Sequence, residues 1–192
     1  MSRASSAHSV GHPDFWPIYE EAERLNVPLA THGAPSMNLG LNSFSHFAMT
    51  AALEHPVAQM IQMTSFVYEG VFDRFPKLKV GFLEAGTGWV PYFLERVDYV
   101  YRHHQAWTNQ DFGDKLPSEV FNEHVLTCYI DDAVGMEVRH HLNMDHVHWE
   151  CDYPHSDSTW PRSPELAMAY LDGLPRDEVD KVTHLNAMRN FS

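Results

Sequence analysis

The chain has few cysteines and few basic residues, and both shortages limit what it can be. Only Cys128 and Cys151 occur in 192 residues, which excludes the dense disulfide framework of a small secreted domain. Both lie in apolar, strand-like stretches, which favours buried free thiols in a reducing cytoplasm. Thirteen Lys and Arg residues stand against 26 Asp and Glu residues, giving a net charge of −13. Without a basic surface, neither nucleic acid nor anionic lipid is an expected partner.

Long apolar runs are also absent. No segment approaches the roughly 20 apolar residues of a transmembrane helix, and the first residues, MSRASSAHSVGHP, contain no secretory signal. We therefore expect a cytoplasmic protein. The small, polar and patternless residues 1–12 predict a disordered lead-in, and residues 13–192 predict a single domain.

Four short apolar segments alternate with helical patterns. The predicted strands cover residues 27–32, 78–84, 124–130 and 147–151. Helices are predicted over about 14–26, 47–53, 57–71, 89–104, 117–122 and 134–142, and again after 163 and 177. This alternation indicates an α/β fold with a parallel sheet. A complete (β/α)8 barrel needs eight such units in about 250 residues, so the pattern fits a partial barrel or a small open sheet.

Polar residues follow every predicted strand. They are His32, Glu84, Asp131 with Asp132, and Asp152 with His155. Because the carboxyl ends of parallel strands meet at one edge of a sheet, we expect these side chains to gather there. Imidazole and carboxylate together suit a divalent cation such as Zn²⁺, or Mn²⁺ and Fe²⁺ with added water. The residues alone leave His32 as either a ligand or a buried polar group, and the Asp131–Asp132 pair as either helix caps or reactive groups.

Two long blocks and one histidine resemble the amidohydrolase-related group, which includes the aminocarboxymuconate-semialdehyde decarboxylase-like enzymes. They are FPKLKVGFLEAGTGWVPYFLERVD (75–98), ECDYPHSDSTWP (150–161) and His32 at its strand end. The resemblance runs from about residue 12 to the end and corresponds to strands five to eight of the family's (β/α)8 barrel. It implies a metal-dependent enzyme that acts on a small organic substrate.

The resemblance also implies roles for single residues. His32 matches a metal-binding histidine of strand five. Asp152 matches a strand-eight aspartate that binds metal and orients or deprotonates the nucleophile. Glu84 stands where decarboxylase-like members carry an acid–base histidine, and it is a candidate base, ligand or substrate contact. His155 and Trp89 are candidate substrate contacts, with loop structure and aromatic packing as their alternative roles.

The family's His-x-His or Glu-x-His pair of strand one has no counterpart on an N-terminal strand here. His103–His104 and His140–His141 are poor substitutes, because adjacent side chains in a helix point about 100° apart. Catalytic zinc sites normally have three protein ligands. We therefore expect weak metal binding, unless Glu84 or His155 joins His32 and Asp152.

Three functions remain as hypotheses at this stage. The first is a metal-dependent hydrolase that uses metal-activated water, and the second is a metal-dependent decarboxylase. The third is a catalytically inactive fragment that associates with itself, since half a barrel leaves strand edges and apolar surface open. A homo-oligomer is expected.

Overall fold

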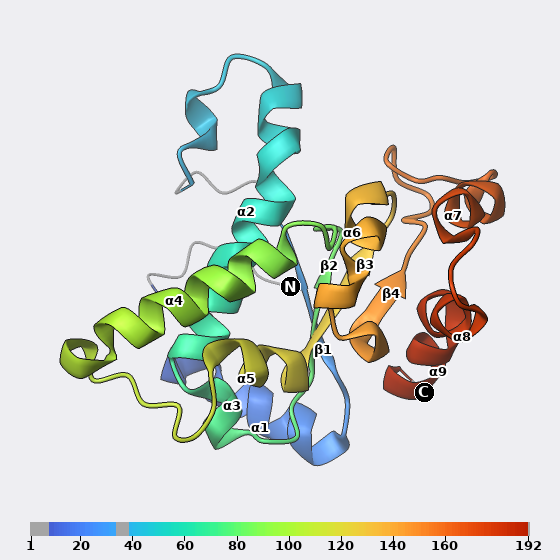
Figure 1. The fold of residues 1–192 in the computed structure, drawn as a ribbon. Coiled ribbons are helices and arrows are strands. Elements are labelled where there is room, and N and C mark those ends of the chain that lie inside the picture. Colours follow the sequence, from blue (N-terminus) through green and yellow to red (C-terminus); the bar gives the residue numbers. More distant parts are fainter. Residues whose placement is uncertain (1–7, 34–38, 192) are drawn as a thin grey trace.

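The computed structural model describes residues 8–33 and 39–191 and contains one parallel sheet (Figure 1). Its strands are β1 (Leu29–His32), β2 (Val80–Leu83), β3 (Val125–Tyr129) and β4 (Val147–Trp149). They pair in chain order, β1-β2-β3-β4. The α/β prediction with four parallel strands is confirmed.

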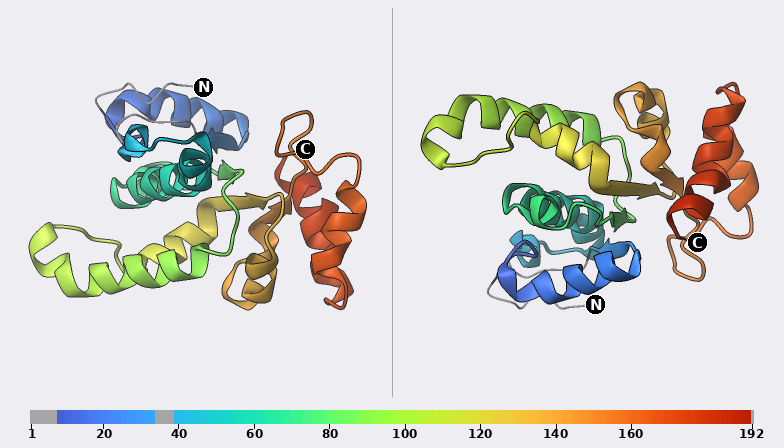
Figure 2. Two further views of the ribbon diagram at one scale, coloured as in Figure 1. Left: turned by 90° about the horizontal axis from the view of Figure 1, so that it is seen from above. Right: turned by 90° about the horizontal axis from the view of Figure 1, so that it is seen from below.

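The helices surround the strands in chain order (Figure 2). They are α1 (Trp16–Leu25), α2 (Phe47–Tyr68), α3 (Val71–Arg74), α4 (Val90–Thr108), α5 (Pro117–His124), α6 (Ala133–Glu137), α7 (Ser163–Leu171), α8 (Arg176–Asp180) and α9 (Asn186–Asn190). A π-helical stretch, Lys181–Leu185, joins α8 to α9. None of the described helices is both long and apolar enough to cross a bilayer.

The core lies between the sheet and the helices of its outer side. Phe66 of α2, Phe72 of α3 and Phe82 of β2 form its aromatic centre and are at most 2% exposed. A second cluster, around Tyr129 and Leu171, covers the β3–β4 end. The opposite face of β1 is open: Ala30 and His32, which point to it, are exposed, whereas Leu29 and Thr31, which alternate with them, are partly buried. The sheet is therefore fixed from one side and presents its other side at β1.

Two of the differences from the predicted boundaries concern α2 and the first residues of the chain. Helix α2 is continuous, with Pro56 inside it, where the sequence predicted two helices. Proline removes one backbone hydrogen bond, but Glu54 and Gln59 on either side of it are buried, so packing holds the helix through this point. The predicted lead-in ended at residue 12, yet Gly11 donates its N–H to Ser65 Oγ, 2.7 Å away. Residues 1–7 lie outside the described residues.

The two outer strands of the sheet each have one neighbour. Among the described residues, β1 pairs only with β2 and β4 only with β3. Open edges of this kind carry unpaired backbone groups that favour pairing with another chain. We propose that the chain self-associates through β1.

A charge on the open edge tests this proposal. Ala30→Lys places an ammonium on β1, where Ala30 is exposed, and should shift the chain toward monomer in sedimentation equilibrium. Ala52→Lys, at an exposed position of α2, should leave the wild-type distribution unchanged. A wild-type chain that stays monomeric at all concentrations would contradict the proposal.

Two buried histidines, His124 and His148, and the partly buried His146 make stability depend on pH. Burial lowers the pKa of His124, His146 and His148, that of His146 to about 4. Between the ordinary histidine pKa of about 6.5 and about 4, the unfolded chain binds protons that the folded chain does not. These groups therefore contribute stability that is fully present above pH 6.5 and is lost as the pH falls toward 4.

We expect His146→Gln to flatten the pH dependence of the free energy of unfolding between pH 6.5 and 4.5. Urea denaturation of the wild type and of His146→Gln, at several pH values and a fixed chain concentration, measures this free energy. The comparison isolates His146 from Glu150, whose raised pKa acts in the opposite direction. Parallel curves for the two proteins would show that His146 is not the group responsible.

Candidate functional site

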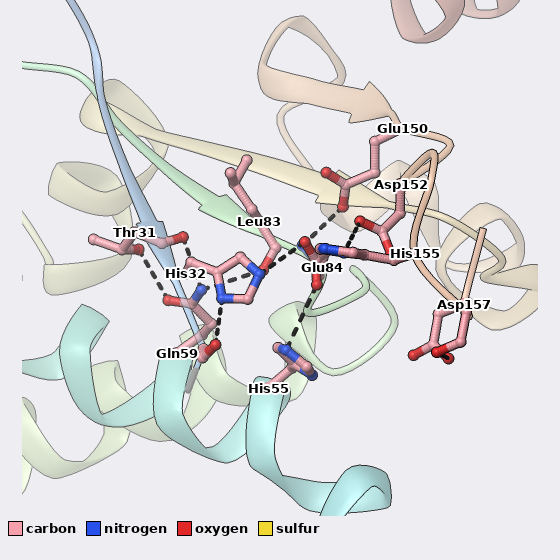
Figure 3. A network of polar contacts seen from close by, with 12 residues as sticks. Thr31, His32, His55, Gln59, Leu83, Glu84, Glu150, Asp152, His155 and Asp157 are labelled. Atoms are coloured by element: carbon pink, nitrogen blue, oxygen red, sulfur yellow. Dashed lines mark hydrogen bonds and ion pairs between the residues drawn. The ribbon is translucent and has the colours of Figure 1, made fainter. Parts of the chain in front are cut away.

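The carboxyl ends of β1, β2 and β4 bring together three residues predicted from the sequence (Figure 3). His32 ends β1, Glu84 directly follows β2, and Asp152 lies three residues beyond β4. The backbone of Glu84 and that of Asp152 have φ angles of 58° and 55°. Residues other than glycine rarely adopt this left-handed region, and strained backbone of this kind is a common feature of functional sites. The prediction of one shared edge is confirmed.

Glu84 is the centre of this edge. Its Oε1 lies 2.8 Å from Nε2 of His32, and its Oε2 lies 3.5 Å from Nε2 of His55. On the other side, Asp152 Oδ1 lies 2.8 Å from Nδ1 of His155. Glu84 belongs to two groups whose possible ligand atoms all lie within 4.8 Å of one another: His32, His55 and Glu84, and Glu84, Asp152 and His155. The predicted ligands His32 and Asp152 fall in different groups, joined through Glu84.

His55 was missed in the sequence. It lies in the middle of α2, in the stretch Glu54-His55-Pro56 that was interpreted as a break between two helices. No sequence spacing links it to the strand ends. Only the packing of α2 against the sheet brings its ring to 5.3 Å from that of His32.

A buried amide fixes α2 at this position. Gln59 is fully buried, and its Nε2 donates to the carbonyl oxygens of Thr31 and Leu83 at 3.0 and 3.2 Å. Its Oε1 accepts a hydrogen bond from Thr31 Oγ1 at 2.9 Å. Thr31 and Leu83 directly precede His32 and Glu84, and Gln59 is four residues from His55 on the same helix face. One side chain thus sets the spacing of all three.

Glu150 adds a further carboxyl group beneath the site. Its Oε1 accepts the backbone N–H of Glu84 at 2.7 Å. The pKa of Glu150 is raised to about 7, mainly by burial and in smaller part by the carboxylates of Glu84 and Asp152, while that N–H and His32 act to lower it. Three carboxyl groups in so small a space favour a bound cation.

The donor set fits a divalent metal ion. Imidazole nitrogens and carboxylate oxygens are the ligands that Zn²⁺ and Mn²⁺ use in proteins. His32, His55 and Glu84 together match the two-histidine, one-glutamate set of several catalytic zinc sites. The adjacent pairs His103–His104 and His140–His141 belong to none of the ligand groups found among the described residues.

Asp132 has a structural role. Its Oδ2 accepts hydrogen bonds from the N–H groups of Thr87 and Gly88 at 2.5 and 2.8 Å, and from Thr87 Oγ1 at 3.0 Å. Its Oδ1 accepts the N–H of Gly135 at 2.8 Å and caps α6. The Gly86–Gly88 turn therefore binds a carboxylate of the chain itself.

Trp89 and His155 flank the site differently. Trp89 lines a cavity of about 650 Å³ beside Glu84 and Asp131. Its Nε1 donates to the carbonyl of Ala85 at 2.8 Å, and its ring packs against Phe93, in agreement with the predicted aromatic packing. The side chain of His155 is 66% exposed, and its position depends on the contact with Asp152.

Comparison with known proteins gives consistent matches. A sequence profile described as Amidohydrolase matches residues 3–192. A 2-amino-3-carboxymuconate-6-semialdehyde decarboxylase of Dictyostelium discoideum is 29% identical over 87 residues, which are 45% of this chain and 23% of that protein. Decarboxylase orsB of Emericella nidulans is 24% identical over 165 residues, which are 80% of this chain and 48% of that protein.

Solved structures show the same fold. The 5-carboxyvanillate decarboxylase LigW from Sphingomonas paucimobilis aligns with a TM-score of 0.82 at 23% identity, over 100% of this chain and 57% of that one. A dihydroxybenzoic acid decarboxylase from Polaromonas sp. JS666, with bound manganese, aligns with a TM-score of 0.74 at 18% identity, over 97% of this chain and 56% of that one. The chain thus spans between 23% and 57% of the length of these four proteins. Its four parallel strands match part of a (β/α)8 barrel.

Asp132 and Asp131 offer a matched test of the carboxylate that holds the turn. We expect Asp132→Ala to lower the free energy of unfolding by about 2–4 kcal/mol, because it removes a helix cap and leaves the N–H groups of Thr87 and Gly88 without their charged acceptor. Asp131→Ala should cost much less. Urea denaturation of both variants measures these changes. Equal losses of unfolding free energy in the two variants would refute the structural role of Asp132.

Proposed function

Because this chain belongs to the amidohydrolase family, we propose that it carries a metal-dependent site for decarboxylation of a small, carboxylate-bearing organic substrate. The observation that carries the proposal is the meeting of His32, Glu84 and Asp152 at one edge of the sheet, where Glu84 shares one group of possible metal ligands with His32 and another with Asp152. The sequence alone placed hydrolysis first. Both curated relatives are named as decarboxylases, which favours decarboxylation.

His32 and Asp152 are the proposed metal ligands, with Glu84 between them. A bound divalent cation supplies Lewis acidity, which draws electron density from the substrate. Zinc fits the histidine and carboxylate donors. Manganese and iron are the alternatives, and two structural neighbours contain bound manganese.

The chain's own residues then handle the proton. Decarboxylation breaks the bond between the carboxyl carbon and its neighbour, releases CO₂ and leaves an electron pair that must be protonated. Glu84 and Asp152 are the carboxyl groups placed to deliver this proton, since their side chains are 15% and 9% exposed at the strand ends. Proton transfer by a positioned group contributes a factor of about 10²–10⁴.

The substrate is proposed to enter the cavity of about 650 Å³ beside Glu84. Trp89 lines this cavity and offers an aromatic wall. His155, at its position beside Asp152, is proposed to contact the substrate's polar groups. A small carboxylate-bearing molecule matches the size of the cavity.

Hydrolysis is the second candidate, and a specific observation favours it. The group after β2 is a carboxylate, Glu84, where decarboxylase-like members are expected to carry histidine. A carboxylate there, with Asp152 nearby, suits removal of a proton from an attacking water molecule. The third hypothesis, an inactive self-associating unit, is favoured by the open edges of β1 and β4.

Asp152→Asn tests the proposed function. The metal-free chain, supplied with Mn²⁺ or Zn²⁺, should release CO₂ from at least one member of a panel of hydroxylated benzoates, and a chelator should stop the release. Asp152→Asn keeps the shape but removes the charge, so kcat should fall by about 10² or more. Asp114→Asn, at an exposed loop position, serves as the control and should keep the rate.

Three other outcomes would contradict this proposal. Metal-dependent cleavage of amides or lactones without CO₂ release would select the hydrolase. Bound metal without turnover on either panel would select the inactive unit. An Asp152→Asn variant with full activity would remove Asp152 from the mechanism.

A further inference from the structure

Three elements of the fold each place one possible metal ligand close to the same point. His32 ends β1, His55 lies on α2 and Glu84 follows β2, and their ligand atoms lie within 4.8 Å of one another. Ligands at about 2.0–2.2 Å from one ion are themselves some 3–4 Å apart. The contacts of 2.8 and 3.5 Å between Glu84 and the two imidazoles are close to that spacing. Small rotations of these side chains would admit an ion.

The ring of His32 is oriented as in a metal ligand. Its Nδ1 faces the carbonyl oxygen of Gly33, and its Nε2 faces Glu84. Metal-binding histidines commonly donate their second ring N–H to a carbonyl in this way, which directs the other nitrogen at the metal. Both ring nitrogens face acceptors, so a metal ion or a proton must lie between Nε2 and the Glu84 carboxylate.

Gly33 allows His55 to come this close. A Cβ atom on Gly33 would lie 2.8 Å from Cα of His55 and 2.7 Å from its Cδ2. Because the first of these atoms is backbone, rotation of the imidazole alone could not relieve the clash. A glycine thus lets α2 approach the end of β1, while the Gln59 amide fixes the helix one turn away. The position of His55 is determined from two sides.

The other group of possible ligands is less suitable. In Glu84, Asp152 and His155, the Nδ1 of His155 already contacts Asp152 at 2.8 Å, and the His155 side chain is 66% exposed. In the first group, the side chains of His32, His55 and Glu84 are 48%, 20% and 15% exposed, so both of its histidines are less exposed than His155. Ordered, partly buried ligands lose less conformational freedom when they bind an ion.

We propose that His55 of α2 is a metal ligand, and that with His32 and one oxygen of Glu84 it forms a three-donor site for a divalent cation. Asp152, the other ligand proposed above, shares a second group with Glu84 and remains a further ligand beside these three. The inference names ligands of the site described above, and its catalytic meaning rests on the proposed function. It replaces the expectation of weak binding by two ligands with a three-ligand set contained in this chain.

Metal binding without any substrate tests the inference. Isothermal titration with ZnCl₂ and with MnCl₂ should show binding to the wild-type chain. His55→Ala and His55→Gln should each weaken it by at least about tenfold, as expected for loss of one of three ligands. His155→Ala should bind almost as tightly as wild type. His103→Ala, at an exposed position of α4, is the matched control for loss of a histidine.

X-ray absorption of the zinc-loaded protein separates a ligand from a merely structural residue. The wild-type spectrum should fit two imidazole nitrogens, and that of His55→Gln should fit one, with far-UV circular dichroism unchanged. If both His55 variants unfold, two imidazoles in the wild-type spectrum, unchanged in His155→Ala, still support the site. A single imidazole there would overturn it.

Three results would overturn the inference: no binding of either metal, full affinity in folded His55 variants, or loss of binding in His155→Ala alone. The proposed function fails independently. Tight, His55-dependent binding without any turnover would leave this site in place and remove the activity.

Discussion

The hydrogen bonds of one buried side chain, Gln59, are the interaction on which the candidate site depends. This amide crosses from α2 to the carbonyl groups that precede His32 and Glu84, and no solvent competes for its contacts. Buried polar groups that are fully satisfied fix a unique arrangement, because any displacement leaves them unpaired. The relative positions of a strand end, a helix and a second strand end therefore have little freedom. A site that binds a metal ion needs this kind of support from the groups behind its ligands.

The same edge of the sheet concentrates negative charge at a cost to the fold. Glu84 and Asp152 adopt left-handed backbone conformations, and burial together with its neighbours raises the pKa of Glu150. Folds tolerate such strain and repulsion where function requires them. The two histidines beside Glu84 only partly offset the charge, since an imidazole is positive only when protonated. A divalent cation would compensate it at every physiological pH.

The edge divides into a part whose polar groups form the candidate site and a part whose carboxylate has a structural role. Around β1, β2 and β4, the polar groups are partly exposed and point at one another. After β3, the carboxylate of Asp132 accepts hydrogen bonds from the Thr87–Gly88 turn and from the first turn of α6. A carboxylate that accepts four hydrogen bonds has no capacity left for an ion or a substrate. The Asp132 carboxylate fixes the turn that leads from Glu84 to Trp89, and so it helps to set the backbone positions of these two residues.

Sequence by itself determined where the four strands lie along the chain, the polar residues at their ends and, through its resemblance, the family. Short apolar runs between helical patterns are local signals, and in a parallel sheet they imply a common edge for His32, Glu84 and Asp152. The tertiary structure alone decided which other side chains reach that edge. His55 is 23 residues from His32 in a helix whose local pattern suggested a break at Pro56, and Gln59 resembles any polar residue of a helix. Their roles come from how α2 packs, through a close approach at Gly33 and an amide bonded to two strands, and helix packing over such separations leaves no periodic mark in the sequence.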